Sequence, residues 1–274
     1  MQISDALMQA VVALVMEAGA AILPYWKTNT EVSQKPDNSP VTAADLAAHH
    51  VLSQGLQRIA PEIPVLSEEA CDIALSERQQ WQRWWLVDPL DGTKEFINGS
   101  DEFTVNVALI EQGQVVFGVV GVPVRQQCFY GGAELGAWLI EPHSNPQPIK
   151  VRNSPETLTV VASRRHSSAL QEQLLATLKQ QFAVDLANIG SSLKFCLLAQ
   201  GLVDFYPRLA PTSQWDTAAA QAVVEGAGGV VLQLDGSRFN YPAKASLLNP
   251  YFMALAKDAP WFASLRPLLA QAKA

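Results

Sequence analysis

The sequence predicts a mixed protein with two lobes, an α+β lobe over residues 1–150 and a smaller α/β lobe over residues 151–274. The chain has 274 residues, which is longer than a typical single domain and short for two independent ones. In the first half, helical patterns precede a run of strands, whereas in the second half strands and helices alternate. Residues 141–155 contain four prolines and have the composition of a linker.

The composition excludes several classes of protein. Hydrophobic residues make up 49% of the chain and charged residues 16%, so the chain can bury a large core and is not disordered. A net charge of −7 argues against general affinity for nucleic acid, although a bound metal ion can reverse the local field of an acidic site. Cys71, Cys128 and Cys196 are odd in number and widely spaced, which favours reduced thiols over a disulfide framework or a zinc site.

The N-terminal stretch over residues 6–22 has apolar residues at helical spacing and predicts an amphipathic helix capped near Ser4. No Lys or Arg precedes Lys27, so the basic segment of a signal peptide is missing. Asp5, just before the apolar run, and Gln9 and Glu17 within it make it a poor membrane span. We expect this helix to pack against the core.

A second helix and then a series of strands are predicted for the rest of the first half. Turn residues indicate a loop at 35–40. The alternation of apolar residues from Phe103 to Leu109 with Thr104, Asn106 and Ala108 indicates a half-buried strand. In order, the expected elements are a helix over 42–59 and strands over 64–66, 84–87, 103–109, 115–122, 127–130 and 136–140.

The second half is predicted to alternate between strands and helices. Gly201 and Gly226 have the character of residues that end a helix. The tail after Pro250 has no predicted element. The expected strands cover 158–162, 184–188, 202–206 and 229–234, and the expected helices cover 168–181, 192–200 and 216–225.

The segment 88–93, D-P-L-D-G-T, is the most informative part of the chain. Asp88 and Asp91 end a buried strand, where paired carboxylates can hold Mg²⁺. A helix that begins at about residue 94 would offer backbone N–H groups to a phosphate. A capped turn is the ordinary alternative. Phosphatases of the haloacid dehalogenase type have a nucleophilic Asp two residues before such an Asp-Gly, but here that residue is Pro89, which cannot attack.

Three further acids lie where elements begin or end. Glu68 follows a short strand, Asp216 opens an Ala-rich helix, and Asp45 lies three residues after Thr42. Each has an ordinary explanation, because acids are common in solvated turns and at helix N-termini.

Together these acids belong to motifs in a fixed order. The motifs are P-V-T-A-A-D at 40–45, S-E-E at 67–69, D-P-L-D-G-T at 88–93, W-D at 215–216 and E-G-A-G-G at 225–229. Their order and spacing resemble the signatures of the inositol monophosphatase superfamily over most of the chain. The resemblance implies a layered αβαβα sandwich of the inositol monophosphatase and fructose-1,6-bisphosphatase type.

The resemblance also implies roles, carried over position by position. One Mg²⁺ would be bound by Glu68, Asp88 and the carbonyl of Leu90, and a second by Asp88, Asp91 and Asp216. The phosphate would meet the amides of Gly92 and Thr93. The attacking water would be oriented by Asp45, Thr93 and Glu68, and a third, weaker Mg²⁺ is left open. The substrate would therefore lie against Glu68, Leu90, Asp91, Gly92, Thr93 and Asp216. Paired metal ions suit such chemistry because they neutralise the phosphoryl group, activate water and stabilise the leaving oxygen.

The segments 91–97 and 102–110 resemble the bacterial 3′(2′),5′-bisphosphate nucleotidases of the CysQ type. Lys194 and Arg208 fit that subfamily, since a bisphosphate has a second anionic group for cations to bind. Each has an alternative as a surface salt-bridge partner. Gly190, Ser191 and Ser192 precede a helix, so their amides are further candidates for substrate binding. The loop at 98–101 is less basic than expected for the subfamily.

The implied reaction is hydrolysis of 3′-phosphoadenosine 5′-phosphate to AMP and phosphate, which removes a by-product of sulfate assimilation, with inhibition by Li⁺. One alternative is an inositol monophosphatase or broad sugar-phosphate phosphatase, and another is a non-catalytic metal- or nucleotide-binding protein. We expect a cytoplasmic monomer or homodimer that binds no nucleic acid. The resemblance leaves open a loose peripheral association with the inner membrane.

Overall fold

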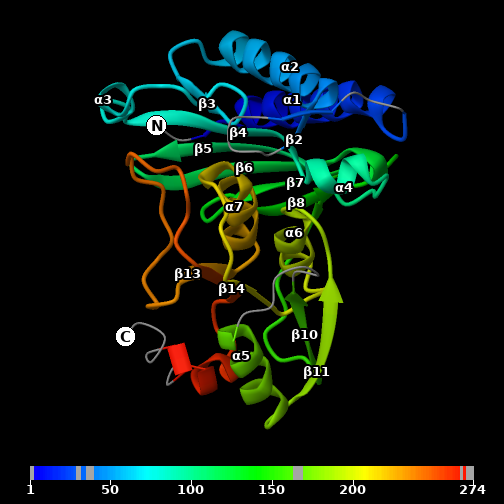
Figure 1. Cartoon of the computed structure of the whole chain (residues 1–274), viewed down its shortest axis with the longest axis vertical. Coiled ribbons are helices and arrows are strands. Elements are labelled where there is room, and N and C mark those ends of the chain that lie inside the picture. The colour runs from blue at the N-terminus through cyan, green and yellow to red at the C-terminus, as the bar shows by residue number, and fades with distance from the viewer. Residues whose placement is uncertain (1–2, 29–31, 35–39, 163–168, 266–267, 270–274) are drawn as a thin grey trace.

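Helices and sheets alternate in five layers along the long axis of the molecule (Figure 1). The computed structural model describes residues 3–28, 32–34, 40–162, 169–265 and 268–269. The predicted loop at 35–40 lies outside these residues except for Pro40. The αβαβα architecture expected from the family resemblance is confirmed.

The outermost layer on one side consists of α1 (Asp5–Ile22) and α2 (Ala43–Ile59). Both helices were predicted, and the hydroxyl of Ser4 caps α1 by accepting from the amide of Leu7 at 3.2 Å. The two helices pack closely, since a Cβ on Gly55 would lie 2.1 Å from a methyl carbon of Leu14. By length and composition the segment Asp5–Tyr25 is apolar enough to cross a membrane, but the predicted apolar stripe of α1 is buried against the sheet.

The first sheet has seven strands in the order β3-β4-β5-β6-β7-β8-β9. Its first pair is parallel and every other pair is antiparallel, which confirms the predicted meander. The strands are β3 (Val65–Ser67), β4 (Arg83–Asp91), β5 (Thr104–Glu111), β6 (Gln114–Val122), β7 (Gln127–Gly132), β8 (Gly136–Ile140) and β9 (Gln147–Pro148).

The prediction that the strand over 103–109 is half-buried is wrong. In β5, Val105 and Val107 face the core beneath α1 and α2, while Ala108 and Ile110 face a second core on the other side of the sheet. Even the polar residue Asn106 is only 1% exposed. Alternation along a strand shows which residues share a face, but it does not show that a helix from the other half of the chain covers the second face.

That covering layer consists of α6 (Leu193–Ala199) and α7 (Ala218–Gly226) (Figure 1). The backbone of α7 touches the sheet directly, because a Cβ on Gly118 would lie 2.1 Å from the carbonyl oxygen of Ala219. The helix predicted from residue 216 begins two residues later, after a 3₁₀ turn over Gln214–Asp216. Because these helices complete the core of the first sheet, the division into lobes at residue 150 stays a prediction.

The second sheet has five strands in the order β11-β10-β12-β14-β13. The tail supplies β14, which was not predicted although all its residues are buried. Beyond this sheet, α5 (Ala169–Lys179) and a 3₁₀ helix over Pro260–Leu265 form the last layer. The strands are β10 (Thr157–Ala162), β11 (Ala183–Asn188), β12 (Phe205–Arg208), β13 (Gly229–Gln233) and β14 (Phe252–Ala256).

Several short elements complete the fold. They are the strand pair β1 (Val32–Gln34) and β2 (Pro40–Thr42), the helices α3 (Leu75–Arg78) and α4 (Thr93–Ile97), and the 3₁₀ turns Leu23–Tyr25 and Pro123–Arg125. Of these, α4 matters most for the site, because it begins directly after β4 and confirms the helix start predicted near residue 94.

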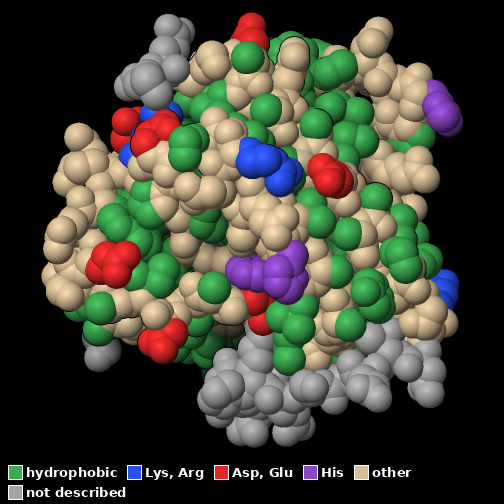
Figure 2. Space-filling view, turned by 90° about the horizontal axis from the view of Figure 1, so that it is seen from above, with side chains coloured by type: hydrophobic (Ala, Val, Ile, Leu, Met, Phe, Trp, Pro, Cys, Tyr) green, Lys and Arg blue, Asp and Glu red, His purple; other side chains and the backbone are tan. Residues whose placement is uncertain are grey.

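The outer face of α1 and α2 carries scattered charges of both signs, and no gathered basic patch is visible among the described residues there (Figure 2). Anionic membrane surfaces bind clusters of Lys and Arg. This face therefore gives no support to a peripheral membrane association.

Candidate active site

The end of β4 carries the two acids of the D-P-L-D-G-T segment. The pairing of β4 with β5 shifts register between Asp88 and Asp91, so the ladder is interrupted between them. The amide of Leu90 donates to the Asp88 carboxylate at 3.0 Å. Gly92 then has a φ of 95°, a left-handed conformation that favours glycine, and α4 starts at the next residue. The chain thus turns sharply just after its paired carboxylates.

Four carboxylates from three parts of the chain gather here. Asp88 is 1% exposed, and its pKa is raised well above the ordinary value, first by burial and then by Glu68, Asp91 and Asp216. The pKa of Asp216 is raised by burial and by Asp91, although its carboxylate accepts from the amide of Ser213 at 2.9 Å. Asp216 is therefore both the third residue of a capping box that begins at Ser213 and a member of the acidic group.

Asp91 connects this group to the second half of the chain. Burial raises the pKa of Asp91 to about 6, while nearby Lys194 and the amide of Ser192 act in the opposite direction. Its carboxylate accepts hydrogen bonds from the Ser192 amide and, at 3.5 Å, from the Thr104 hydroxyl. The hydroxyl of Ser192 donates to Asn106 at 2.8 Å, so a buried polar network supports Asp91 from behind.

Asp45 lies at the start of α2 and faces Thr93 at the start of α4. One oxygen of Asp45 accepts from the amide and the hydroxyl of Thr42, each at 2.7 Å, which completes the predicted capping box. The other oxygen accepts from the Thr93 hydroxyl at 3.3 Å. That hydroxyl also lies 3.3 Å from the carbonyl oxygen of Leu90. The ordinary role of Asp45 as a cap and its contact with Thr93 therefore coexist.

The donor set fits Mg²⁺. It comprises the carboxylates of Glu68, Asp88, Asp91 and Asp216 and the carbonyl of Leu90, all of them hard oxygen ligands of the kind this cation prefers. Carboxylates whose pKa values are raised by one another are stabilised by an added cation. Within the described part of the chain, no three carboxylate, imidazole or thiol groups already surround one point. The fit therefore rests on the chemistry of the donors.

A cavity of about 320 Å³ opens beside these acids. It brings together residues from both halves of the sequence. Of the predicted site residues, Asp91, Gly92, Gly190, Ser191, Ser192, Lys194, Arg208 and Asp216 line it. The other predicted residues, Asp45, Glu68, Asp88, Leu90 and Thr93, are not among its lining residues. The wall of the cavity thus contains both carboxylates and cationic side chains.

Lys194 is not a surface residue, so the salt-bridge alternative for it is wrong. Its side chain is 6% exposed, and its ammonium group donates to the carbonyl of Ser191 at 3.0 Å. The nitrogen also lies 5.7 Å from the centre of the Tyr206 ring. Burial lowers the pKa of Lys194 to about 8, against the opposing attraction of Asp91.

Arg208 reaches the same cavity from the end of β12. Its guanidinium group donates to the carbonyls of Ala210 and Pro211, at 3.2 and 3.0 Å. These contacts hold the side chain in place, and its charge acts on Lys194 and Asp216. Lys194 and Arg208 therefore both line the cavity, together with Lys94.

The loop 190–192 differs from its prediction in one respect. The amide of Gly190 donates to Glu102 at 2.8 Å, and the amide of Ser192 donates to Asp91. Two of the three amides predicted to meet the substrate are therefore engaged by carboxylates, which leaves Ser191 as the amide of this loop that can meet it. The left-handed φ of 47° at Ser191 sets the direction of the loop.

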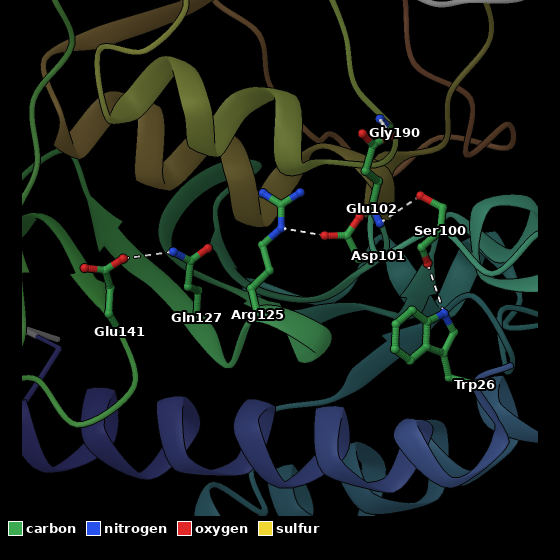
Figure 3. Close-up of polar contacts among 8 residues, drawn as sticks. All are labelled: Trp26, Ser100, Asp101, Glu102, Arg125, Gln127, Glu141 and Gly190. Carbon is green, nitrogen blue, oxygen red and sulfur yellow. Dashed lines mark hydrogen bonds and ion pairs between the residues drawn. The ribbon is translucent and has the colours of Figure 1, made fainter.

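Several residues of the site were not predicted to have a role. Thr104 and Asn106 lie behind Asp91, and Glu95, Glu102 and Tyr206 line the cavity. Thr104 and Asn106 could have been identified from the sequence, because they are polar residues in an otherwise apolar strand. Glu102 lies two residues before β5, and only its contact with the amide of Gly190 connects it to the 190–192 loop (Figure 3).

A model of the inositol monophosphatase family matches residues 4–264 of the chain. The chain is 47% identical over 248 residues to the 3′(2′),5′-bisphosphate nucleotidase CysQ of Salmonella typhimurium, covering 90% of this chain and 98% of that relative. The protein of the same name from Escherichia coli K12 is 46% identical with the same coverage.

Solved structures agree with these sequence relationships. CysQ from Bacteroides thetaiotaomicron, described as a bacterial member of the inositol monophosphatase family, has a TM-score of 0.79 and 36% identity, over 92% of this chain and 97% of that chain. The IMPase of Thermotoga maritima has a TM-score of 0.77 at 22% identity, over 97% of both chains, and shows the same fold.

Proposed function

The chain belongs to the inositol monophosphatase family, and we propose that within it the protein hydrolyses the 3′-phosphate of 3′-phosphoadenosine 5′-phosphate, releasing AMP and phosphate. Its relatives are named as 3′(2′),5′-bisphosphate nucleotidases, at 46–47% identity over 90% of this chain. The observation that carries the proposal is one cavity lined by Asp91 and Asp216 and also by Lys194 and Arg208. A substrate with two phosphate groups would use both sets.

We propose Mg²⁺ as the cofactor, with two ions and a weaker third left open. Glu68, Asp88 and the carbonyl of Leu90 would hold one ion, and Asp91 and Asp216 would hold the second together with Asp88. When bound, Mg²⁺ neutralises the phosphoryl group and activates the attacking water. The raised pKa values of Asp88 and Asp216 are consistent with this role, since burial and neighbouring carboxylates disfavour their ionised forms, which a bound cation would stabilise.

The protein's own residues position the reactants. Thr93 and Asp45 would orient the water, because the Asp45 oxygen that faces Thr93 can accept a hydrogen bond or a proton from it. The other oxygen is engaged by Thr42, which holds the carboxylate in one orientation. The amides of Gly92 and Thr93, at the start of α4, would hold the transferred phosphoryl group.

Lys194 and Arg208 would bind the second phosphate. A buried ammonium group attracts an anion more strongly than an exposed one, because less water screens the interaction. An inositol or sugar monophosphate has no second phosphate for these cations. We therefore favour the nucleotide bisphosphate over the alternatives of an inositol monophosphatase or a broad sugar-phosphate phosphatase.

The deciding experiment measures phosphate release from 3′-phosphoadenosine 5′-phosphate, inositol 1-phosphate, fructose 1,6-bisphosphate and AMP, each with Mg²⁺, with EDTA and with added Li⁺. We expect Mg²⁺-dependent, Li⁺-sensitive release that is fastest from the nucleotide bisphosphate. Preference for a sugar or inositol phosphate would overturn the substrate while keeping the site. Absence of release from every ester would favour a non-catalytic binding protein.

A further inference from the structure

We propose that Glu102 is a positioning residue that fixes the loop 190–192 against the substrate cavity. The inference rests on the proposed function for its kinetic consequence, but its structural basis is independent of any substrate. Glu102 precedes β5, and its carboxylate accepts a hydrogen bond from the amide of Gly190 at 2.8 Å (Figure 3). Hydrogen bonds to an ionised acceptor are stronger than neutral ones, so this contact is well suited to hold a loop.

The backbone of Glu102 lies between two loops of the site. A Cβ on Gly190 would lie 2.8 Å from the carbonyl oxygen of Glu102, and a Cβ on Gly92 would lie 3.2 Å from the same oxygen. Both glycines line the cavity. The close approach of both glycines to one residue means that a shift of Glu102 would move the turn at Gly92 and the 190–192 loop together.

Contacts outside the cavity anchor Glu102. Its amide donates to the hydroxyl of Ser100 at 3.2 Å, and the carbonyl of Ser100 accepts from the indole nitrogen of Trp26 at 3.1 Å. The neighbouring Asp101 pairs with Arg125 at 3.0 Å, but both side chains are partly exposed, so this ion pair adds little to the anchoring of Glu102. Figure 3 shows these contacts in sequence from Trp26, which follows the 3₁₀ turn after α1, to Gly190. The segment 100–102 is therefore tied to the N-terminal layer on one side and to the loop on the other.

The loop is held by one charged side chain at each of its three residues. Glu102 binds the amide of Gly190, Lys194 binds the carbonyl of Ser191, and Asp91 binds the amide of Ser192. Asp91 and Lys194 have proposed roles with the metal and the second phosphate. Of these three side chains, Glu102 can therefore be replaced without removing a proposed metal- or phosphate-binding group.

The test compares Glu102→Ala, Glu102→Asp, Glu102→Gln and the control Asp101→Asn in the full-length protein. Asp shortens the side chain out of reach of Gly190, whereas Gln keeps an oxygen that can accept the hydrogen bond. The first readout is hydrogen–deuterium exchange of the Gly190 amide in substrate-free protein. The second is kcat and KM for 3′-phosphoadenosine 5′-phosphate.

We expect the Gly190 amide to exchange about tenfold faster in the Ala and Asp variants, at an intermediate rate in the Gln variant, and near the wild-type rate in the Asp101→Asn variant. KM should rise about tenfold in the Ala and Asp variants, which is roughly the effect of losing one such hydrogen bond. The value of kcat should fall less than about threefold. If the Ala variant does not fold, the Asp variant gives the same comparison.

Unchanged exchange in both shortened variants would overturn the positioning role, as would an equal effect of Asp101→Asn. A fall in kcat at constant KM would also overturn it, because that pattern indicates a role in the chemical step. If the exchange rates change as expected but the wild-type protein does not hydrolyse the nucleotide bisphosphate, the positioning role stands and the proposed substrate fails.

Discussion

The carboxylate of Asp45 lies 3.3 Å from the hydroxyl of Thr93, although 48 positions separate the two residues. The same carboxylate caps α2 through Thr42. The carboxylate of Asp45 thus makes two kinds of contact. One stabilises the N-terminus of α2, and the other places a hydrogen-bond acceptor beside the end of β4. This relationship supports the assignment of Asp45 to the water-orienting position.

Replacing Asp45 with Asn tests that assignment. The Asn side chain can still cap α2, because its oxygen accepts the same hydrogen bonds, but it cannot accept a proton. We expect kcat for phosphate release to fall about 10²-fold or more, as for loss of a general base. The thermal midpoint should change little. An unchanged kcat would rule out the proposed role of Asp45.

Replacing Lys194 with Met tests the second phosphate site. The change keeps a long apolar stem in the buried position and removes the charge. We expect KM for 3′-phosphoadenosine 5′-phosphate to rise about tenfold or more, since one charge-assisted contact is lost. Hydrolysis of a monophosphate such as inositol 1-phosphate should change less than threefold.

The matched control is Lys179→Met, at the exposed end of α5. It removes the same charge from the molecule without touching the cavity. Equal effects of the two substitutions would show that net charge, and not a local site, controls the KM.

The raised pKa of Asp91 predicts how stability depends on pH when metal is removed. Its pKa in the folded protein is about 6, above the value near 3.9 of an unfolded chain. Because the folded state favours the protonated form, ionisation costs stability as the pH rises from about 4 through about 6. In EDTA, Asp91→Asn should therefore be more stable than wild type at pH 8, by about 1–3 kcal/mol, and equal to it near pH 4.

Urea unfolding at both pH values measures this difference. Addition of Mg²⁺ at pH 8 should stabilise the wild type more than the variant, because the ion offsets the charge that the substitution removes. A variant less stable than wild type at pH 8 in EDTA would contradict the expected sign.

Gly118 provides a test of the contact between the first sheet and α7. An added Cβ would lie 2.1 Å from the backbone oxygen of Ala219, and backbone cannot rotate away as a side chain can. We expect Gly118→Ala to lower the free energy of unfolding by about 3 kcal/mol through overpacking. Gly236→Ala is the control, since that residue has a φ of 81° but nothing within 4 Å, and it should cost about 1 kcal/mol. Equal costs would show that the layers are less closely packed than described.

Much of the fold was predictable because local residue patterns determine many of its helices and strands. The caps of α1 and α2, the meander of the first sheet and the alternation after residue 157 follow from periodicity and from residues such as Ser4, Thr42 and Gly201. The strand β14 was missed, because the short apolar run after Pro250 has no partner visible in sequence. It lies between β12 and β13, as an interior strand next to the edge of the sheet.

The site, like the fold, was predictable only in part. The sequence alone determined the identity and order of the acids, since the motifs at 40–45, 67–69, 88–93 and 215–216 are local and each places its acid at the end of an element. Only the tertiary structure decided which groups share one cavity. It placed Lys194 in the interior, engaged the amides of residues 190 and 192 with Glu102 and Asp91, and buried both faces of β5. Those outcomes depend on packing between segments about 100 residues apart, which local residue patterns do not encode.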